Sequence, residues 1–113
     1  MKQNLNEKYL NEIMFMKCKE CSYQITENLN KPRLEILNFK EKTFYAVKSI
    51  DARYFLFAGK NKLFNISINS FLYEELLCIT CKKKLGIRIK SCREDLKYLI
   101  NNYFLIKTKK VLL

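Results

Sequence analysis

Two short cysteine pairs constrain this chain more than any other feature of its 113 residues. The first pair is Cys18 and Cys21, the second is Cys78 and Cys81, and each encloses two residues. A CxxC segment forms a tight turn that presents both thiolates to one ion, and two such turns complete a closed, tetrahedral zinc site. The chain contains no histidine, so sulfur is the natural ligand set. We therefore predict one structural Zn²⁺ held by these four cysteines.

Catalysis and redox chemistry are the alternative uses of these cysteines. A catalytic zinc keeps an open coordination position, which four thiolates do not leave. A redox CxxC begins a helix within a βαβ unit, and neither pair is followed by that pattern. The fifth cysteine, Cys92, lies between Lys90 and Arg93. If these cations lowered its pKa, the thiol would be reactive; the competing interpretation is an inert thiol in a turn. Because no histidine is available for a Ser-His-Asp or Cys-His pair, we expect no enzyme.

The segment between the cysteine pairs reads as β-structure. It is far longer than the roughly 15–20 residues that separate the pairs of a compact zinc finger, so it must fold and bring its ends together. Residues 53–57 and 62–68 are strand-like and flank 58–61, where Gly59 and Asn61 indicate a hairpin turn. Further strands are predicted at 34–39, 43–50, 71–77 and 103–107. The expected fold is mainly β, with two antiparallel sheets clamped by the four-cysteine zinc site.

The N-terminal segment differs from the rest of the chain. Leu5, Tyr9 and Ile13 recur at a spacing of four, so residues 1–14 are predicted to form a tail with helical periodicity. Residues 15–113 form one predicted β domain. The chain has neither the uninterrupted apolar core of a secretory signal nor an apolar run of about 18 residues, so we expect a soluble, intracellular protein without membrane contact.

A CxxC, a mostly β insert and a second CxxC followed closely by Leu-Gly resemble the Yippee-like superfamily. The residues that carry this resemblance are the four cysteines, Leu85 and Gly86. The segment after the glycine looks most like the Mis centromere-licensing (kinetochore) family, in which a Ser/Thr-containing turn leads to Leu-x-Tyr and then to an aromatic-x-Leu strand. Here these positions are Ser91, Leu96, Tyr98, Tyr103 and Leu105.

The resemblance implies a fold and a function. The fold is a β-tent of two sheets with zinc at its apex. The function is that of a non-enzymatic adaptor in the nucleus, at the centromere, which forms homo-oligomers or joins related subunits and helps to license loading of the centromeric histone. Its partners would be centromeric chromatin proteins, and no small-molecule substrate is expected. The alternatives are a generic Yippee-like zinc-binding protein, a basic nucleic-acid-binding module, and a redox enzyme on the same scaffold.

Positive charge is concentrated after the second cysteine pair. The formal net charge is +11, and ten basic residues stand against Glu94 and Asp95 from Lys82 onward. A basic surface of this kind attracts phosphate or acidic protein surfaces in a salt-dependent way, so DNA is a candidate partner. The alternative is an ordinary solvated face. The candidate binding patch consists of Lys82, Lys83, Lys84, Arg88, Lys90, Lys107, Lys109 and Lys110.

Overall fold

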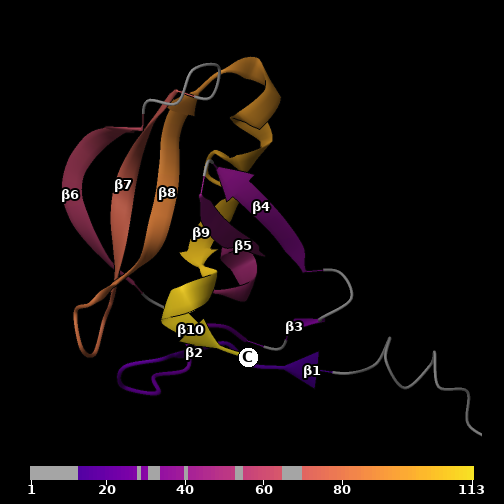
Figure 1. The fold of residues 1–113 in the computed structure, drawn as a ribbon, viewed down its shortest axis with the longest axis vertical. Helices are drawn as coiled ribbons and strands as arrows, with labels where there is room; N and C mark the ends of the chain where they lie inside the picture. The colour runs from indigo at the N-terminus through magenta and orange to yellow at the C-terminus, as the bar shows by residue number, and fades with distance from the viewer. Residues whose placement is uncertain (1–12, 28, 31–33, 40, 53–54, 65–69) are drawn as a thin grey trace, which may run out of the picture.

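A computed structural model describes residues 13–27, 29–30, 34–39, 41–52, 55–64 and 70–113 (Figure 1). The longer strands are β4 (Glu35–Phe39), β5 (Lys42–Lys48), β6 (Phe55–Phe64), β7 (Phe71–Cys78), β8 (Lys84–Cys92) and β9 (Tyr103–Lys107). The short ones are β1 (Ile13–Met14), β2 (Lys17–Cys18), β3 (Leu29–Asn30) and β10 (Val111–Leu112). Single 3₁₀ segments, η2 (Ser49–Asp51), η3 (Glu94–Leu99) and η4 (Thr108–Lys110), connect some of them.

The six longer strands form one antiparallel sheet in the order β4-β5-β9-β8-β7-β6. The ladder between β8 and β9 is short, with only the pairs Gly86 to Ile106 and Ile87 to Leu105 among the described residues. The sheet is therefore divided into two three-stranded leaves, β4-β5-β9 and β6-β7-β8, which lie at an angle to each other (Figure 1). At one end, β1 pairs with β3 and β2 pairs with β10. The prediction of a mainly β fold with two antiparallel sheets and a four-cysteine cluster is confirmed.

The predicted hairpin at 58–61 is wrong. Residues 55–64 form one continuous strand, β6, along which Phe57 pairs with Leu76 and Asn61 pairs with Glu74 of β7. Four steps along β6 thus match two steps along β7, so the extra residues form a bulge. Glycine and asparagine, which signal a turn, also fit such an irregularity. The segments on either side of it pair with β7 instead of with each other.

The other element predictions have different outcomes. Strands lie close to the predicted positions 34–39, 43–50, 71–77 and 103–107, although the second ends in the 3₁₀ segment η2. Residues 1–12 of the predicted helical tail and residues 65–68 of the predicted strand at 62–68 lie outside the described residues. Residues 13–14, the end of the tail, form the strand β1.

The apolar side chains pack into two clusters, because alternate residues of a strand face opposite sides of the sheet. On β7, Leu76 and Cys78 enter the first cluster, whereas Phe71 and the half-buried Tyr73 enter the second. The first cluster surrounds the cysteines and includes Met16, Ile25, Val47, Leu85, Ile106 and Val111. The second joins the inner faces of both leaves and includes Phe39, Phe44, Ile87, Ile89, Leu99 and Leu105.

Candidate metal centre

The fold brings the four predicted ligands together. The Sγ atoms of Cys18, Cys21, Cys78 and Cys81 all lie within 4.8 Å of one another. The Sγ atoms of Cys18 and Cys81 are 3.7 Å apart, and those of Cys21 and Cys78 are 3.5 Å apart. Four thiolates at the usual zinc–sulfur distance of about 2.3 Å occupy a tetrahedron with edges of about 3.8 Å. The cluster therefore has the donor set and spacing to coordinate one metal ion.

Each cysteine pair lies in its own backbone turn, and the two turns have the same hydrogen-bond pattern. The N–H of Ser22 donates to the carbonyl of Cys18 at 2.8 Å, and the N–H of Cys18 donates to the carbonyl of Tyr23 at 2.9 Å. In the second turn, Lys82 donates to Cys78 at 2.8 Å and Cys78 donates to Lys83 at 2.9 Å. The matching hydrogen bonds show that both cysteine pairs adopt the same turn, which places its two thiols side by side.

The residue after each second cysteine has a left-handed backbone. Both Ser22 and Lys82 have φ of 64°. A non-glycine residue in this region carries a steric cost, so its presence at equivalent places in both turns reflects a requirement of the turn itself. The sequence contains no glycine at either position and therefore gives no signal of this conformation.

The ligands differ in burial. Cys18 and Cys78, which end β2 and β7, have no exposed surface, whereas Cys21 and Cys81 are partly exposed. The fully buried Met16 and Ile25 pack in the same cluster as the inner pair. One side of the centre is thus covered by apolar side chains, while the outer thiols are partly exposed to solvent.

The environment of the cysteines favours ionisation of Cys78 over that of Cys18 and Cys21. Burial disfavours the thiolate of Cys78, but N–H groups of Cys81 and Thr80 and the neighbouring thiols outweigh it and lower the Cys78 pKa to about 7. Burial raises the pKa of Cys18. The N–H of Tyr23 favours the Cys21 thiolate, but burial and the surrounding thiols prevail and raise the Cys21 pKa to about 12. Metal binding must therefore release protons, and affinity for the ion should fall in acid.

The end of the chain reinforces the first turn. Val111 of β10 pairs with Cys18 of β2, and the N–H of Lys19 donates to the carbonyl of Lys110 at 3.0 Å. Two ligands near the beginning of the chain are thus held in place by residues at its end. This contact could not be predicted from the sequence, because strands of two residues have no detectable alternation.

Leu85 and Gly86 have separate structural roles beside the metal centre. Leu85 is 1% exposed and packs in the cysteine-containing cluster. Gly86 lies where β8 crosses β9, and a β-carbon at this position would overlap the carbonyl oxygen of Leu105. Gly86 does not adopt a positive φ, so backbone conformation does not explain the need for glycine here. The close approach of the two backbones explains it.

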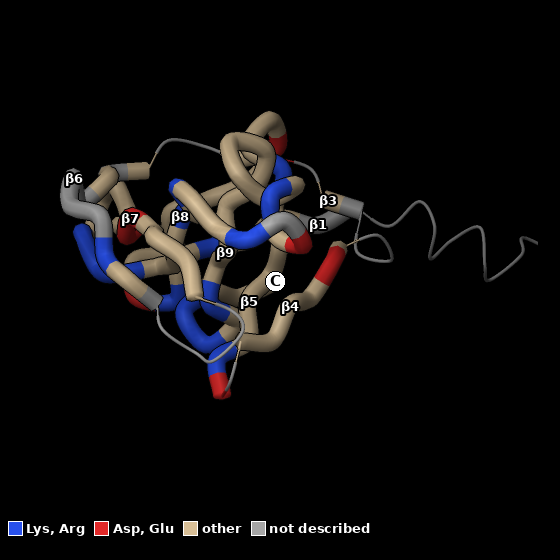
Figure 2. The backbone as a smooth tube through the Cα atoms, turned by 90° about the horizontal axis from the view of Figure 1, so that it is seen from above, with Lys and Arg blue, Asp and Glu red and all other residues tan. Residues whose placement is uncertain are grey.

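The predicted basic patch is distributed over several parts of the surface. Lys84, Lys107, Lys109 and Lys110 line neighbouring cavities together with Lys42 and Lys62. The exposed Lys82 and Lys83 belong to the second cysteine turn, and the exposed Lys90 lies farther along β8. Figure 2 shows basic stretches of backbone beside β5 and β9. Lys42 and Lys62 were not singled out by sequence because only the sheet brings β5 and β6 to the same cavities.

Arg88 has a different environment from the exposed lysines. Its Nη2 donates to Oε1 of the buried Glu74 at 3.0 Å, and its guanidinium carbon lies 4.1 Å from the ring centroid of Phe57. These contacts make Arg88 a partner of a buried carboxylate. Cys92, the fifth cysteine, ends β8, packs beside the second apolar cluster and is not part of the four-thiol group.

Searches of protein families and of curated proteins find no match to this sequence. Within the described part of the chain, no helix has both the length and the apolar character needed to cross a membrane.

Proposed function

We propose that the chain is a non-enzymatic, zinc-stabilised adaptor domain. The observation that carries this proposal is the closed group of four cysteines, whose sulfur spacing matches tetrahedral coordination. Zinc is the ion typical of a four-thiolate tetrahedron without histidine. Four protein ligands leave no coordination position for a substrate, which supports a structural ion and not a catalytic one.

Metal analysis of the purified protein tests the zinc assignment. We expect one zinc per chain, lost in Cys78→Ser together with the folded state, because a structural site supplies folding free energy on the order of 10 kcal/mol. Cys92→Ser is the matched control, since it removes a thiol outside the cluster and should retain the ion. A wild-type protein that folds normally after complete chelation would refute the structural role.

We further propose that this adaptor acts as Mis-type proteins do, as an oligomer or with related subunits, at centromeric chromatin in the nucleus. Support comes from the resemblance in sequence and from the roles of the residues that carry it. The cysteines form the metal centre, Leu85 packs beneath it, and Gly86 permits the crossing of the two leaves. Residues with these roles define the shape of the domain, as expected of a binding scaffold.

Imaging of the endogenously tagged protein with the centromeric histone through the cell cycle tests this assignment. We expect discrete, cycle-dependent overlap, which Cys78→Ser abolishes and Cys92→Ser preserves. Diffuse signal from a zinc-loaded, folded protein at all stages would contradict the centromeric function while leaving the zinc-stabilised scaffold intact.

A basic nucleic-acid-binding module is the second candidate function. The gathering of lysines from β5, β6, β8 and β9 around neighbouring cavities supports it, because clustered cations attract nucleic-acid phosphates. Binding to DNA or RNA that weakens steeply with added salt is the expected result. Equal affinity at low and high salt would exclude this mode of binding.

A further inference from the structure

A small cavity lies on the inner side of the sheet, where the two leaves meet. It has a volume of about 150 Å³ and takes its walls from five strands, β5 to β9. Phe44, Ile87 and the backbone of Gly86 supply its apolar part. Four lysines, which we call the lysine cluster, supply most of its polar part: Lys42, Lys62, Lys84 and Lys107. Glu75 and Tyr73 complete the polar lining.

Four lysines and one carboxylate line the first cavity, so the formal charge of its lining is positive. Glu75 contacts both Lys62, at 2.7 Å, and Lys84, at 2.9 Å. One carboxylate therefore serves two ammonium groups of the cavity wall, while Lys42 and Lys107 add two further charges. The cavity has a formal charge of +3 when its residues are ionised as usual at neutral pH.

Lys107 occupies the least favourable position for a cation. Its side chain is half-buried, and it makes no ion pair with any residue that the structure describes. Burial and then the charges of Lys42, Lys110 and Lys84 lower the Lys107 pKa, against a weaker opposing effect of Glu75. An anion placed among these groups would relieve both the desolvation of the ammonium and its repulsion by the neighbouring lysines.

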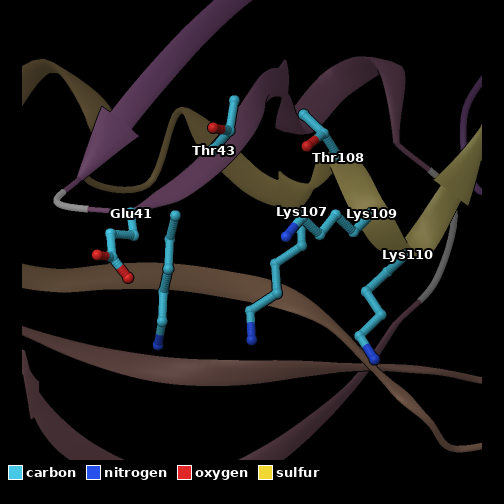
Figure 3. A pocket seen from close by; sticks show the side chains of 7 residues that line it. Glu41, Thr43, Lys107, Thr108, Lys109 and Lys110 are labelled. Carbon is cyan, nitrogen blue, oxygen red and sulfur yellow. The ribbon is translucent and has the colours of Figure 1, made fainter.

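A second cavity adjoins the first and extends the basic surface. It has a volume of about 220 Å³ and shares Lys42 and Lys107 with the first cavity. In Figure 3, Lys107 and Lys110 point in the same direction, toward the facing leaf. Thr43 and Thr108 also line this cavity, where the Thr43 hydroxyl donates to Oδ1 of Asn38 at 2.8 Å and Glu41 is the carboxylate. The two cavities share Lys42 and Lys107, and ammonium groups from both leaves line the first of them.

We infer that the lysine cluster binds a phosphate or diphosphate group. A multiply charged tetrahedral anion offers acceptor oxygens in several directions, which matches ammonium groups arriving from different strands better than a planar carboxylate does. The first cavity has room for about five water molecules at roughly 30 Å³ each, enough for an anion of this size. This inference is independent of the centromeric assignment and requires only the folded domain.

Titration of the zinc-loaded protein with pyrophosphate at fixed ionic strength tests the site. We expect saturable binding, followed by the amide NMR signals of Lys84 and Gly86, and about tenfold weaker binding in Lys107→Met, because one charged hydrogen-bond donor is lost. Lys90→Met is the matched control: it removes an exposed charge from β8 outside the cavity and should change affinity by less than about twofold. If ATP competes with pyrophosphate for the site, a nucleotide is a ligand. If ATP does not compete, the ligand is the free anion.

Glu75→Gln gives a test of opposite sign. It removes the carboxylate of the first cavity and should tighten pyrophosphate binding severalfold, whereas general damage to the fold would weaken it. Equal losses of affinity for pyrophosphate in Lys107→Met and Lys90→Met would overturn the inference. NMR changes caused by removal of zinc by pyrophosphate would also overturn it, and they would be the same in both variants. Equally tight binding of an unphosphorylated acidic peptide, unaffected by Lys107→Met, would also overturn it.

Discussion

Replacement of Gly86 by alanine should destabilise the domain strongly. Exchange of glycine for alanine at a backbone with ordinary φ normally stabilises a protein by about 0.4–1 kcal/mol. Here the new β-carbon would overlap the Leu105 carbonyl oxygen and lie 2.9 Å from the α-carbon of Ile106. Carbon atoms pack best at about 3.5–4.0 Å, so the two strands must separate by at least about 0.6 Å.

The cost follows from the short ladder at this crossing. Two residue pairs connect β8 to β9, and their separation removes about two backbone hydrogen bonds, each contributing about 1 kcal/mol. Overpacking against the fully buried Leu105 and Ile106 adds about 1–3 kcal/mol. We therefore expect Gly86→Ala to lower the free energy of unfolding by about 3–5 kcal/mol, a large part of the total for a domain of this size.

Urea denaturation of the zinc-loaded protein, followed by circular dichroism, measures this cost. Ser91→Ala is the control, because it alters an exposed position of the same strand and should change stability by no more than about 0.5 kcal/mol. The zinc content of both variants is measured in parallel to separate strand displacement from loss of the ion. A Gly86→Ala protein as stable as the wild type would refute the close approach of the two leaves.

Three further perturbations test contacts away from this crossing. Burial disfavours the Glu75 carboxylate, but the ammonium groups of Lys62 and Lys84 outweigh burial and lower the Glu75 pKa. The ion pairs therefore stabilise the fold above the pKa of about 4.3 that Glu75 has in the unfolded chain, and this stabilisation is lost as pH falls through the lower pKa of the folded state. Glu75→Gln should therefore lower the free energy of unfolding by about 1 kcal/mol at pH 7, and the difference from wild type should shrink as pH falls toward about 4, measured with excess zinc over the range in which both proteins stay zinc-loaded. A difference that does not shrink over this range contradicts the ion-pair explanation. Arg88→Met should cost about 3–5 kcal/mol by leaving the buried Glu74 without its partner, and adding Glu74→Leu should recover most of that loss in a double-mutant cycle. Additive effects of these two changes would exclude their coupling. Cys92→Ser should lower the urea midpoint only slightly, because the half-buried thiol packs beside the second apolar cluster but lies outside the four-thiol group, and loss of zinc from this variant would contradict that placement.

The metal centre was the most predictable part of the molecule. Cysteine spacing alone identified Cys18, Cys21, Cys78 and Cys81, and their sulfur atoms meet as expected. This succeeded because the geometry of a CxxC turn is local, and because the sequence after neither pair has the helical βαβ pattern that the redox alternative requires. The left-handed backbone after each pair was not predictable, since serine and lysine carry no preference for it.

Strand pairing was less accessible than strand position. Alternation located most of the longer strands, but Gly59 and Asn61 indicated a turn where β6 continues through a bulge. Local turn preferences cannot reveal that β7 is available to pair on both sides of the irregularity. The lysine cluster was missed for a related reason. Lys42 and Lys62 are distant in sequence from the C-terminal basic segment, and only the order of strands in the sheet brings them to Lys84 and Lys107.

The pairing of β10 with β2 has a consequence for folding during synthesis. All four metal ligands have been made once residue 81 is in place, and closing the loop of about 57 residues from Cys21 to Cys78 costs roughly 3.6 kcal/mol of chain entropy. Capture of the ion can offset this cost at that stage. The partner of Cys18, Val111, is still missing, and so is β9, the strand that joins the leaves. A nascent chain could therefore hold an ion between the four thiols before β9 and β10 have been made, but it can complete its tertiary structure only once these two strands are available to pair.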